Sequence, residues 1–372
     1  MSTAGPPQGA KAPLGGSDVH EVIKRGGNSS APCARVARRP VHGVLLLDKP
    51  LGWSSNDALQ KVKWLMRAEK AGHTGTLDPL ATGLLPLCFG AATKFSQLQL
   101  DADKTYEAVA RLGVKTTTGD AEGEVIAERP VKVTAEEIND VAPRFTGLIR
   151  QIPPMHSALK KDGKALYEYA RAGIEVERQA REVTIYELNL ALAHVDIEYE
   201  AIKIVVKCSK GTYIRTLAED IGEALGCGAH LTQLRRIETG GFDVAQCVTL
   251  AALEAMTDEE RWSQLLPVES LLREHTVVSL DDENAGRFLS GVRRRGRWPD
   301  SGQVAVYGPL IGAWQAQRVL MGTAHVVAGE LIPGRLLSPL EIEQIAGDGG
   351  SGSGELCAVP PSTPQKTDFD QI

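Results

Sequence analysis

The spacing of apolar and polar residues along the chain predicts an alternation of strands and helices. Residues 43–48, GVLLLD, form a short continuous apolar run that is typical of a buried strand. Ser54 is a good cap for a helix, and helical spacing follows at Ala58, Leu59, Val62, Leu65 and Met66. Residues 105–113, TYEAVARLG, are predicted to form the next strand.

The same alternation continues through the second third of the chain. Thr134 and Glu137 form a capping box for a short helix that should end before Pro143. GKALYEYARAG is predicted to be a helix closed by Gly173. Residues 201–208 place Ile, Ile, Val and Cys on one face of a half-buried strand, and the amphipathic run TYIRTLAEDIGEALG predicts a helix ending at Gly226. This mixture indicates an α/β protein.

The sequence pattern changes near residue 275. Short strand-like runs such as QVAVYG and RVLMGTAHVV are separated by Gly and Pro, which predicts a small β-rich domain over residues 275–345. Residues 1–40 and 347–372 are rich in small or charged residues and lack periodicity, so both are expected to be disordered tails. The main domain should therefore span residues 41–270.

Composition limits the class of protein. The 372 residues contain no apolar run long enough to cross a membrane, and residues 1–40 lack the apolar core of a secretory signal, so a cytoplasmic protein is expected. The six cysteines include no CxxC pair, which argues against a zinc site. The net charge of −6 argues against a generic nucleic-acid coat, although a local basic patch could still contact RNA or DNA.

The densest candidate for chemistry is the loop AGHTGTLDPLATGLLPL, residues 71–87, which holds a single carboxylate, Asp78. Asp78 precedes Pro79, a favoured first residue of a helix, so the plainest interpretation is a helix cap. A carboxylate held at a helix start would also suit a nucleophile, so the two interpretations are compatible. The neighbouring leucines Leu77, Leu80, Leu84 and Leu85 suit a dry pocket.

Other residues of this loop argue against a metal site and against a nucleotide-binding loop. His73 has no Cys or His neighbour, which favours a structural role over metal binding, and its ring could instead stack on a base or fill the gap that a base leaves. Gly72 and Gly75 lack the Lys that ends a Walker loop, and no GxGxxG follows a strand. No nucleotide cofactor or metal is expected.

Three further positions carry two interpretations each. Arg215, in KCSKGTYIRTLAEDIG, could be a surface charge or the bidentate partner of Asp78. Tyr106 could be an ordinary strand aromatic or a stacking platform. The run Arg293, Arg294 and Arg295 beside Trp298 could be a solvated face or a set of phosphate contacts.

Six blocks of sequence, in order, resemble the TruB family of pseudouridine synthases, which modify uridine 55 in the T arm of tRNA. The resemblance runs from about Gly43 to Leu250, and residues 275–345 resemble the family's PUA-like domain more weakly. The blocks are GVLLLDKPLGWSSNDALQKVK, AGHTGTLDPLATGLLP, DKTYEAVARLG, QIPPMHSALKKDGKALYEYARAGI, CSKGTYIRTLAEDIG and CGAHLTQLRR.

The resemblance implies a role for particular residues. Asp78 would be the catalytic aspartate, Arg215 would pair with it, and Tyr106 would stack on the target base. Tyr213 and Leu234 would line the uracil pocket, and His73 would occupy space near the flipped-out nucleotides. Family knowledge leaves two routes open, attack of Asp78 at ribose C1′ and a glycal intermediate.

The resemblance also implies a fold and partners. It implies an α/β fold of the α+β type, with a mixed, largely antiparallel central sheet flanked by helices and a small C-terminal β-rich PUA-like domain. The enzyme would act on tRNA with no guide RNA, cofactor or membrane, and nothing in the sequence demands more than a monomer.

Three alternatives remain open from the sequence. The first is an RNA-guided pseudouridine synthase of the dyskerin type, although the compact length and the lack of long lysine-rich tails favour a stand-alone enzyme. The second is a non-catalytic protein that binds or refolds RNA. The third is a glycoside hydrolase, which would need two partnered carboxylates where this loop offers one.

Overall fold

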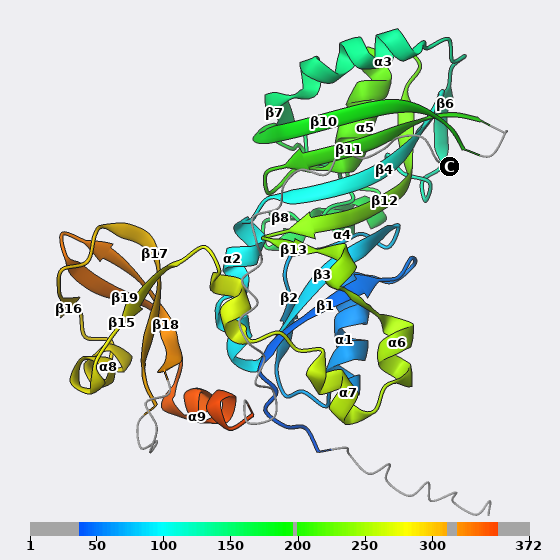
Figure 1. Ribbon diagram of the computed structural model, residues 1–372. Helices are drawn as coiled ribbons and strands as arrows, with labels where there is room; N and C mark the ends of the chain where they lie inside the picture. The colour runs from blue at the N-terminus through cyan, green and yellow to red at the C-terminus, as the bar shows by residue number, and fades with distance from the viewer. Residues whose placement is uncertain (1–36, 196–198, 311–317, 349–372) are drawn as a thin grey trace, which may run out of the picture. The chain divides into compact units, whose positions relative to one another are not determined.

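A computed structural model describes residues 37–195, 199–310 and 318–348 of the chain (Figure 1). Most of the two predicted tails, 1–40 and 347–372, lies outside the described residues, and the predicted division into domains at 41–270 and 275–345 stays a prediction. None of the described helices is long and apolar enough to cross a membrane.

A mixed sheet of ten strands forms the centre of the fold (Figure 1). Its order is β14-β1-β3-β12-β4-β11-β10-β7, with β13 paired to β12 and β2 paired to β3. Only the pairs β1/β14 and β3/β12 are parallel, which confirms the predicted largely antiparallel sheet. The strands are β1 (Gly43–Lys49), β2 (Ala71–His73), β3 (Ala81–Phe89), β4 (Lys104–Leu112), β7 (Gly147–Gln151), β10 (Arg181–Val195), β11 (Tyr199–Cys208), β12 (Ala229–Thr239), β13 (Phe242–Asp243) and β14 (Val248–Thr249).

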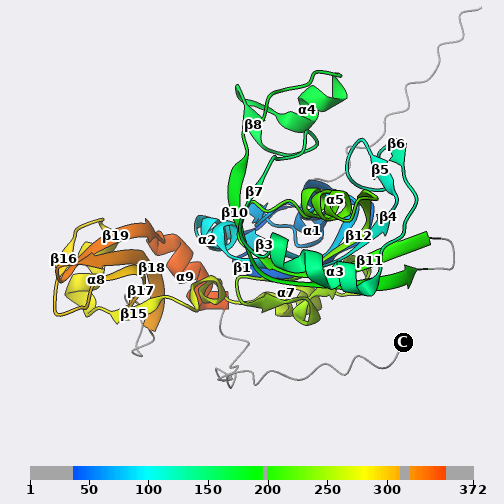
Figure 2. The ribbon, with the colours of Figure 1, turned by 90° about the horizontal axis from the view of Figure 1, so that it is seen from above.

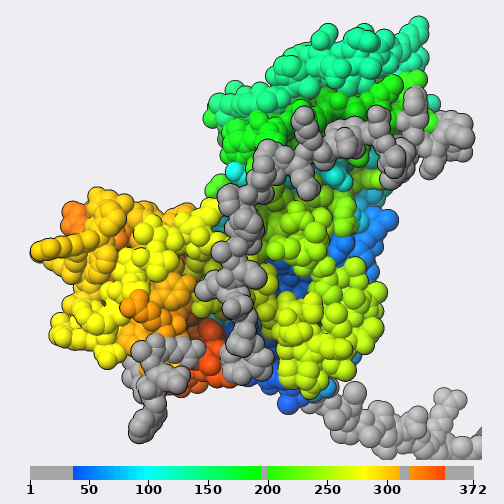
Figure 3. All heavy atoms as spheres, viewed as in Figure 1, coloured from blue at the N-terminus to red at the C-terminus, as the bar shows by residue number. Residues whose placement is uncertain are grey.

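Helices cover one face of this sheet in two groups. α1 (Ser55–Leu65) and α6 (Leu250–Ala255) pack on the β1 and β3 half, whereas α3 (Ala135–Val141) and α5 (Ile214–Ala224) pack on the β4, β11 and β10 half. Tyr106 and Leu234 pack against both of the cores that these helices form with the sheet, so the two cores meet on the same face of the sheet (Figure 2). Figure 3 shows α3 lying over β10 on the outside of the molecule.

The opposite face packs against short helices and the C-terminal region. Alternate residues of β1 divide between the faces: Leu45 and Leu47 join the helix-covered core, whereas Val44 and Leu46 join a core with Phe95, Leu271 and Leu320. The elements on this side include α2 (Ser96–Asp101) and the 3₁₀ helices η1 (Gly90–Lys94), η3 (Val244–Gln246) and η4 (Val268–Leu272).

Two insertions extend from the sheet. One is a hairpin of β5 (Val114–Thr116) and β6 (Val125–Glu128), and the other holds β8 (Lys160–Lys161), β9 (Lys164–Ala165) and α4 (Leu166–Arg171). Figure 2 shows β8 and α4 standing away from the sheet between β7 and β10. The remaining elements of this region are η2 (Ala142–Phe145) and α7 (Asp258–Ser263).

The C-terminal region is a five-stranded sheet in the order β15-β17-β18-β19-β16, as its short strand-like runs predict. Lys94 on η1 forms an ion pair of 2.5 Å with Glu341 on α9, which ties this region to the central sheet. The elements are β15 (Thr276–Ser279), α8 (Asp282–Leu289), β16 (Arg294–Arg295), β17 (Ser301–Pro309), β18 (Arg318–Val327), β19 (Glu330–Leu336) and α9 (Pro339–Asp348).

Most of the predicted elements are present, and two predictions are wrong. The Thr134–Glu137 capping box opens α3 as predicted, and the four predicted inward residues of β11 are at most 1 % exposed. Asp78 does not cap a helix, because Pro79 and Leu80 form a turn that leads directly into strand β3. The helix ending near Gly173 is shorter than predicted, because Lys164 and Ala165 are taken up by a hairpin.

Candidate active site

The loop that carries Asp78 joins β2 to β3 and is held from three sides. The amide of Thr74 donates to the carbonyl of Pro86 (3.1 Å), and the amide of Gly52 donates to the carbonyl of Pro79 (2.9 Å). Ser55, at the start of α1, clamps Leu77: its hydroxyl donates to the Leu77 carbonyl (2.9 Å) and accepts from the Leu77 amide (2.8 Å). These hydrogen bonds therefore fix the backbone of the loop immediately before Asp78.

Asp78 forms the ion pair with Arg215 that was expected from the sequence. Nη2 of Arg215 lies 2.9 Å from Oδ2 of Asp78, whose side chain is 41 % exposed, while the Arg215 side chain is 6 % exposed. Nη2 also donates to the carbonyl of His156 (2.6 Å), and Nη1 donates to the carbonyl of Thr118 (3.1 Å). The guanidinium is thus fixed by the protein and presents one edge to an accessible carboxylate.

A second carboxylate, Asp120, completes this arrangement. Its Oδ2 lies 3.4 Å from Nη1 of Arg215, and its side chain is 4 % exposed. Thr118 and the amide of Glu122 donate to the other oxygen. Arg215 therefore lies between a buried carboxylate, which balances its charge, and an accessible one, which remains available to a substrate.

Asp78 and Arg215 line a cavity of about 230 Å³ on the helix-covered face of the sheet. Tyr106, Tyr213 and Leu234 line the same cavity, so the structure brings together five of the residues singled out from the sequence. Leu77, Ala81 and Ile214 supply apolar wall. Leu84 and Leu85 do not line it, because they are fully buried within strand β3, and the prediction that they form its walls is wrong.

Two aromatic side chains line the cavity. Tyr106 comes from β4, and burial raises the pKa of its hydroxyl, so the ring is neutral. Tyr213 precedes α5, where its amide donates a hydrogen bond to Oε1 of Gln151 (3.0 Å), and burial raises the pKa of its hydroxyl as well. Leu234 on β12 lies opposite Ala81 of β3 and adds an apolar surface. A flat ring can stack against side chains of this kind.

His73 lies on β2, next to the loop but outside the residues that line the cavity. Burial lowers its pKa, and Arg236 acts in the same direction, so the ring is neutral near pH 7. Its Nδ1 is buried and has no hydrogen-bond partner among the described residues. No three His, Cys, Asp or Glu side chains among the described residues converge as metal ligands would.

Sequence reasoning missed three buried polar residues that support the site. Asp120 follows a Thr-rich turn and looks like an ordinary turn residue. Arg236 donates to the carbonyls of Leu84 (2.7 Å) and Gly75 (3.2 Å), and these two bonds link the loop to strand β3. Lys49 donates to the carbonyl of Trp53 (2.7 Å), and burial lowers its pKa to about 8. Arg215, Leu84 and Gly75, the partners of Asp120 and Arg236, are distant in sequence, whereas Lys49 bonds within its own segment. The only local signal was the charge of Lys49 at the end of the apolar strand β1.

The arginine run lies in the C-terminal sheet and is partly engaged. Arg293 and Arg295 lie 3.3 Å and 3.7 Å from the two carboxylate oxygens of Glu330, and Arg294 donates to Asn284 (2.8 Å). Arg295 has a 90 % exposed side chain. One carboxylate balances two of these arginines, which leaves a local positive charge on an acidic protein.

Two family models match the chain in succession. Residues 63–214 match the TruB family pseudouridylate synthase N-terminal domain, and residues 215–273 match the tRNA pseudouridylate synthase B C-terminal domain. Curated relatives named tRNA pseudouridine synthase B are similar over most of the chain. The one from Verminephrobacter eiseniae is 62 % identical and covers 84 % of this chain and 93 % of its own length. The one from Ralstonia nicotianae is 57 % identical and covers 82 % and 96 %.

Solved structures share the fold. A Cbf5–Nop10–Gar1 complex contains a chain with a TM-score of 0.59 and 25 % identity, covering 81 % of this chain and 86 % of its own length. A structure of an H/ACA RNP bound to a substrate RNA gives a TM-score of 0.57 at 23 % identity, covering 80 % and 86 %. The family models, the long and close relatives and the shared architecture lead to one conclusion: this chain belongs to the TruB family of pseudouridine synthases.

Proposed function

We propose that this protein converts uridine 55 in the T arm of tRNA to pseudouridine, as a stand-alone enzyme that needs no guide RNA, cofactor or metal. The observation that carries the proposal is the Asp78–Arg215 ion pair of 2.9 Å at the wall of a cavity lined by Tyr106, Tyr213 and Leu234. The curated relatives, at 57–62 % identity, are named for the same reaction class on tRNA.

The chemistry requires one carboxylate and a protected base. The bond between ribose C1′ and uracil N1 breaks, the base turns, and a bond forms between C1′ and C5; the proton on C5 is lost and N1 gains a proton. No electrons are exchanged with another molecule. Asp78 can serve either by attacking C1′ or by removing a ribose proton on a glycal route. In both routes Arg215 orients the carboxylate and balances its charge.

The uridine must leave the RNA stack to reach Asp78. Unstacking costs a few kcal/mol, and stacking on an aromatic ring such as Tyr106 returns about 1–3 kcal/mol. Tyr213 and Leu234 would hold the other sides of the base. Leu77, Ala81 and Ile214 would keep water from the detached base, so that it rejoins the ribose instead of diffusing away. His73 would lie beside the vacated stack.

The stand-alone mode rests on the relatives and on the lack of a required partner in the proposed chemistry. The solved neighbours are complexes in which the related chain occurs with partner proteins or RNA, so an RNA-guided mode is the direct competitor. The two modes differ in a simple way: a guided enzyme is inactive on a short RNA without its guide.

The test uses purified protein and an unmodified T-arm stem-loop in the presence of a chelator, with pseudouridine mapped by chemical adduct and primer extension. Wild type should modify the T-loop uridine, and Asp78→Asn should abolish turnover while RNA affinity changes little, because the substitution removes charge and keeps shape. Asp140→Asn, on the exposed surface of α3, is the matched control and should retain full activity. Modification by Asp78→Asn, or no modification by any variant, would overturn the proposal.

A further inference from the structure

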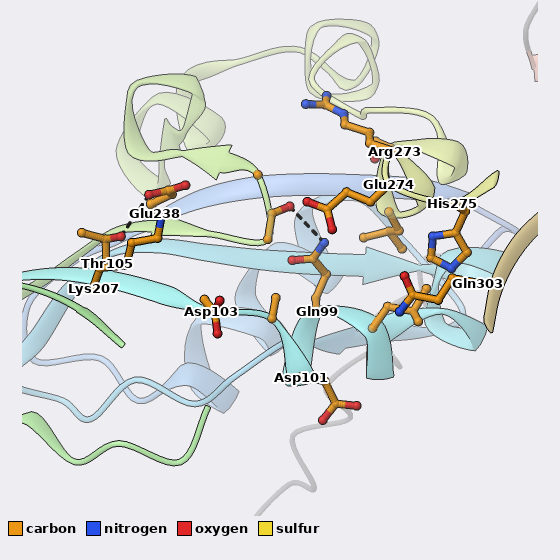
Figure 4. A pocket seen from close by; sticks show the side chains of 16 residues that line it. Gln99, Asp101, Asp103, Thr105, Lys207, Glu238, Arg273, Glu274, His275 and Gln303 are labelled. Atoms are coloured by element: carbon orange, nitrogen blue, oxygen red, sulfur yellow. Dashed lines mark hydrogen bonds between the residues drawn. The ribbon is translucent and has the colours of Figure 1, made fainter. Parts of the chain in front are cut away.

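A second cavity, of about 530 Å³, lies on the face of the central sheet opposite the candidate active site (Figure 4). Thr105 and Lys207 line this cavity, whereas their strand neighbours Tyr106 and Cys208 line the active-site cavity. Successive side chains of a strand point to opposite faces, so the two cavities lie back to back. The proposed pseudouridine synthesis uses none of the side chains of this second cavity.

Three buried polar atoms around the second cavity have no partner in the described part of the chain. They are Oε1 of Gln99, Oγ of Ser270 and Nδ1 of His275. Gln99 and Ser270 are 4 % and 7 % exposed, so bulk water does not reach them freely. Burial lowers the pKa of His275, so its ring is neutral near pH 7 and one ring nitrogen can accept a hydrogen bond. All three atoms are hydrogen-bond acceptors, and a rotation of the Gln99 or Ser270 side chain would turn its oxygen toward a bound N–H group.

The charges of the cavity favour a cation. Its rim carries four carboxylates and two basic side chains. Asp101 is engaged by Lys210 at 2.8 Å, and the Arg273 guanidinium lies over the Phe242 ring; Figure 4 shows both turning away from the cavity. The remaining carboxylates are Asp103, Glu238 and Glu274, against the single ammonium of Lys207.

The geometry of the remaining groups suits an extended ligand. In Figure 4, Glu274 and Gln99 extend toward each other across the cavity, Glu238 lies toward one end and His275 lies toward the other. Glu238 accepts the Thr105 hydroxyl with one carboxylate oxygen (2.9 Å), which fixes its orientation and leaves the second oxygen available. Leu98 and Leu271 supply apolar wall between these polar groups.

We propose that this cavity binds a small aliphatic cation with two or more amino groups, of the polyamine class. Ammonium groups would donate to Glu238, Glu274 and the unpartnered oxygens of Gln99 and Ser270, while the methylene chain between them would lie on Leu98 and Leu271. A compact hydrated metal ion could satisfy only one end of such a site. The proposal concerns binding alone and does not depend on the proposed activity.

Calorimetric titration of the full chain with spermidine, in low salt and without RNA, tests this directly. One saturable site is expected for wild type. Glu274→Gln and Glu238→Gln should each weaken binding at least tenfold. Glu259→Gln, which removes the same charge from the exposed surface of α7, should leave the affinity unchanged. Glu274 is exposed at the cavity mouth, so Glu274→Gln should fold even if Glu238→Gln does not.

Three results would overturn the proposal. Heat without saturation, or several weak sites, would mean general attraction to an acidic protein. Equal weakening by Glu274→Gln and Glu259→Gln would mean the same. Saturable binding of Mg²⁺ that Glu274→Gln abolishes, with no binding of spermidine, would assign the cavity to a metal ion.

Discussion

Nη1 of Arg215 lies 3.4 Å from Oδ2 of Asp120, a carboxylate whose side chain is only 4 % exposed. Arg215 is itself buried, and its other terminal nitrogen faces the accessible Asp78. The buried partner keeps the guanidinium in place whether or not a substrate occupies the cavity. Loss of Arg215 would therefore affect both the orientation of Asp78 and the electrostatic balance of Asp120.

Arg215→Ala should abolish most activity and also destabilise the protein. Removing one member of a buried ion pair leaves the other uncompensated, which costs about 3–5 kcal/mol. The double variant Arg215→Ala with Asp120→Asn should recover much of the unfolding free energy, because no buried charge is left unpaired, yet remain inactive. Urea unfolding and single-turnover kinetics measure the two effects separately. Recovery of activity in the double variant would contradict the role proposed for Arg215.

Ser55→Ala should lower turnover without a large change in RNA affinity. The Ser55 hydroxyl makes two hydrogen bonds to the backbone of Leu77, the residue before Asp78, and is buried. Its removal leaves a buried amide and carbonyl without partners, which costs about 1–3 kcal/mol of stability. Comparison of kcat with the RNA dissociation constant measures the effect. Ser263→Ala, on α7 far along the chain, is a control expected to retain turnover. A loss of RNA binding equal to the loss of kcat would show that the loop contacts RNA instead of only positioning Asp78.

The burial of Lys104 predicts how the free energy of unfolding depends on pH. Its ammonium donates to the carbonyls of Gln99, Leu100 and Ala102, which hold the segment that separates the two cavities. Burial lowers its pKa from 10.5 to about 8, and the same cause brings the pKa of Lys49 to about 8. Below pH 8 each lysine is protonated in both the folded and the unfolded state. Between pH 8 and 10.5 the unfolded state binds more protons, so these two lysines make the free energy of unfolding rise with pH.

Lys104→Met should remove about half of the rise in unfolding free energy that the two lysines cause between pH 8 and 10.5, since their pKa values are lowered equally. The measurement is urea unfolding of wild type and variant from neutral to alkaline pH, with the difference in unfolding free energy plotted against pH. Lys132→Met, at an exposed position, serves as the control and should run parallel to wild type. A parallel curve for Lys104→Met would mean that Lys104 titrates normally in the folded protein.

Local sequence signals predicted much of the fold. The capping box of Thr134, the alternation in β11 and the apolar run of β1 each depend on residues close in sequence. Strand β3 could not be found in this way, because both of its faces are buried and no alternation remains. Pro86 within it also argues against a central strand, since Pro cannot donate to the ladder. The Asp78–Pro79 pair then suggested a helix where the chain makes a turn.

The candidate active site was predicted only in part, because local sequence signals do not show contacts between residues that are far apart in sequence. The Asp78–Arg215 pair was anticipated because family resemblance supplied the long-range contact that spacing cannot give. Asp120 was missed because nothing in its own neighbourhood distinguishes it from a turn residue; its importance comes from Arg215, 95 positions later along the sequence. Buried charges such as Arg236 show their role only once their carbonyl partners are known.

The arginine run of the C-terminal sheet gives the last prediction. If Arg293 and Arg295 contact RNA phosphates, they must exchange Glu330 for phosphate oxygens on binding. Arg293→Glu with Arg295→Glu should weaken tRNA binding and lower the slope of log affinity against log salt by about 1.5, because each phosphate contact contributes about 0.7–0.9. Glu330→Gln should act in the opposite direction and strengthen binding, since it frees both arginines. Filter binding of full-length tRNA across a salt series measures both. An unchanged slope in the double variant, together with no effect of Glu330→Gln, would mean that this run is a solvated face of the protein, with its charge balanced by Glu330 and not by RNA.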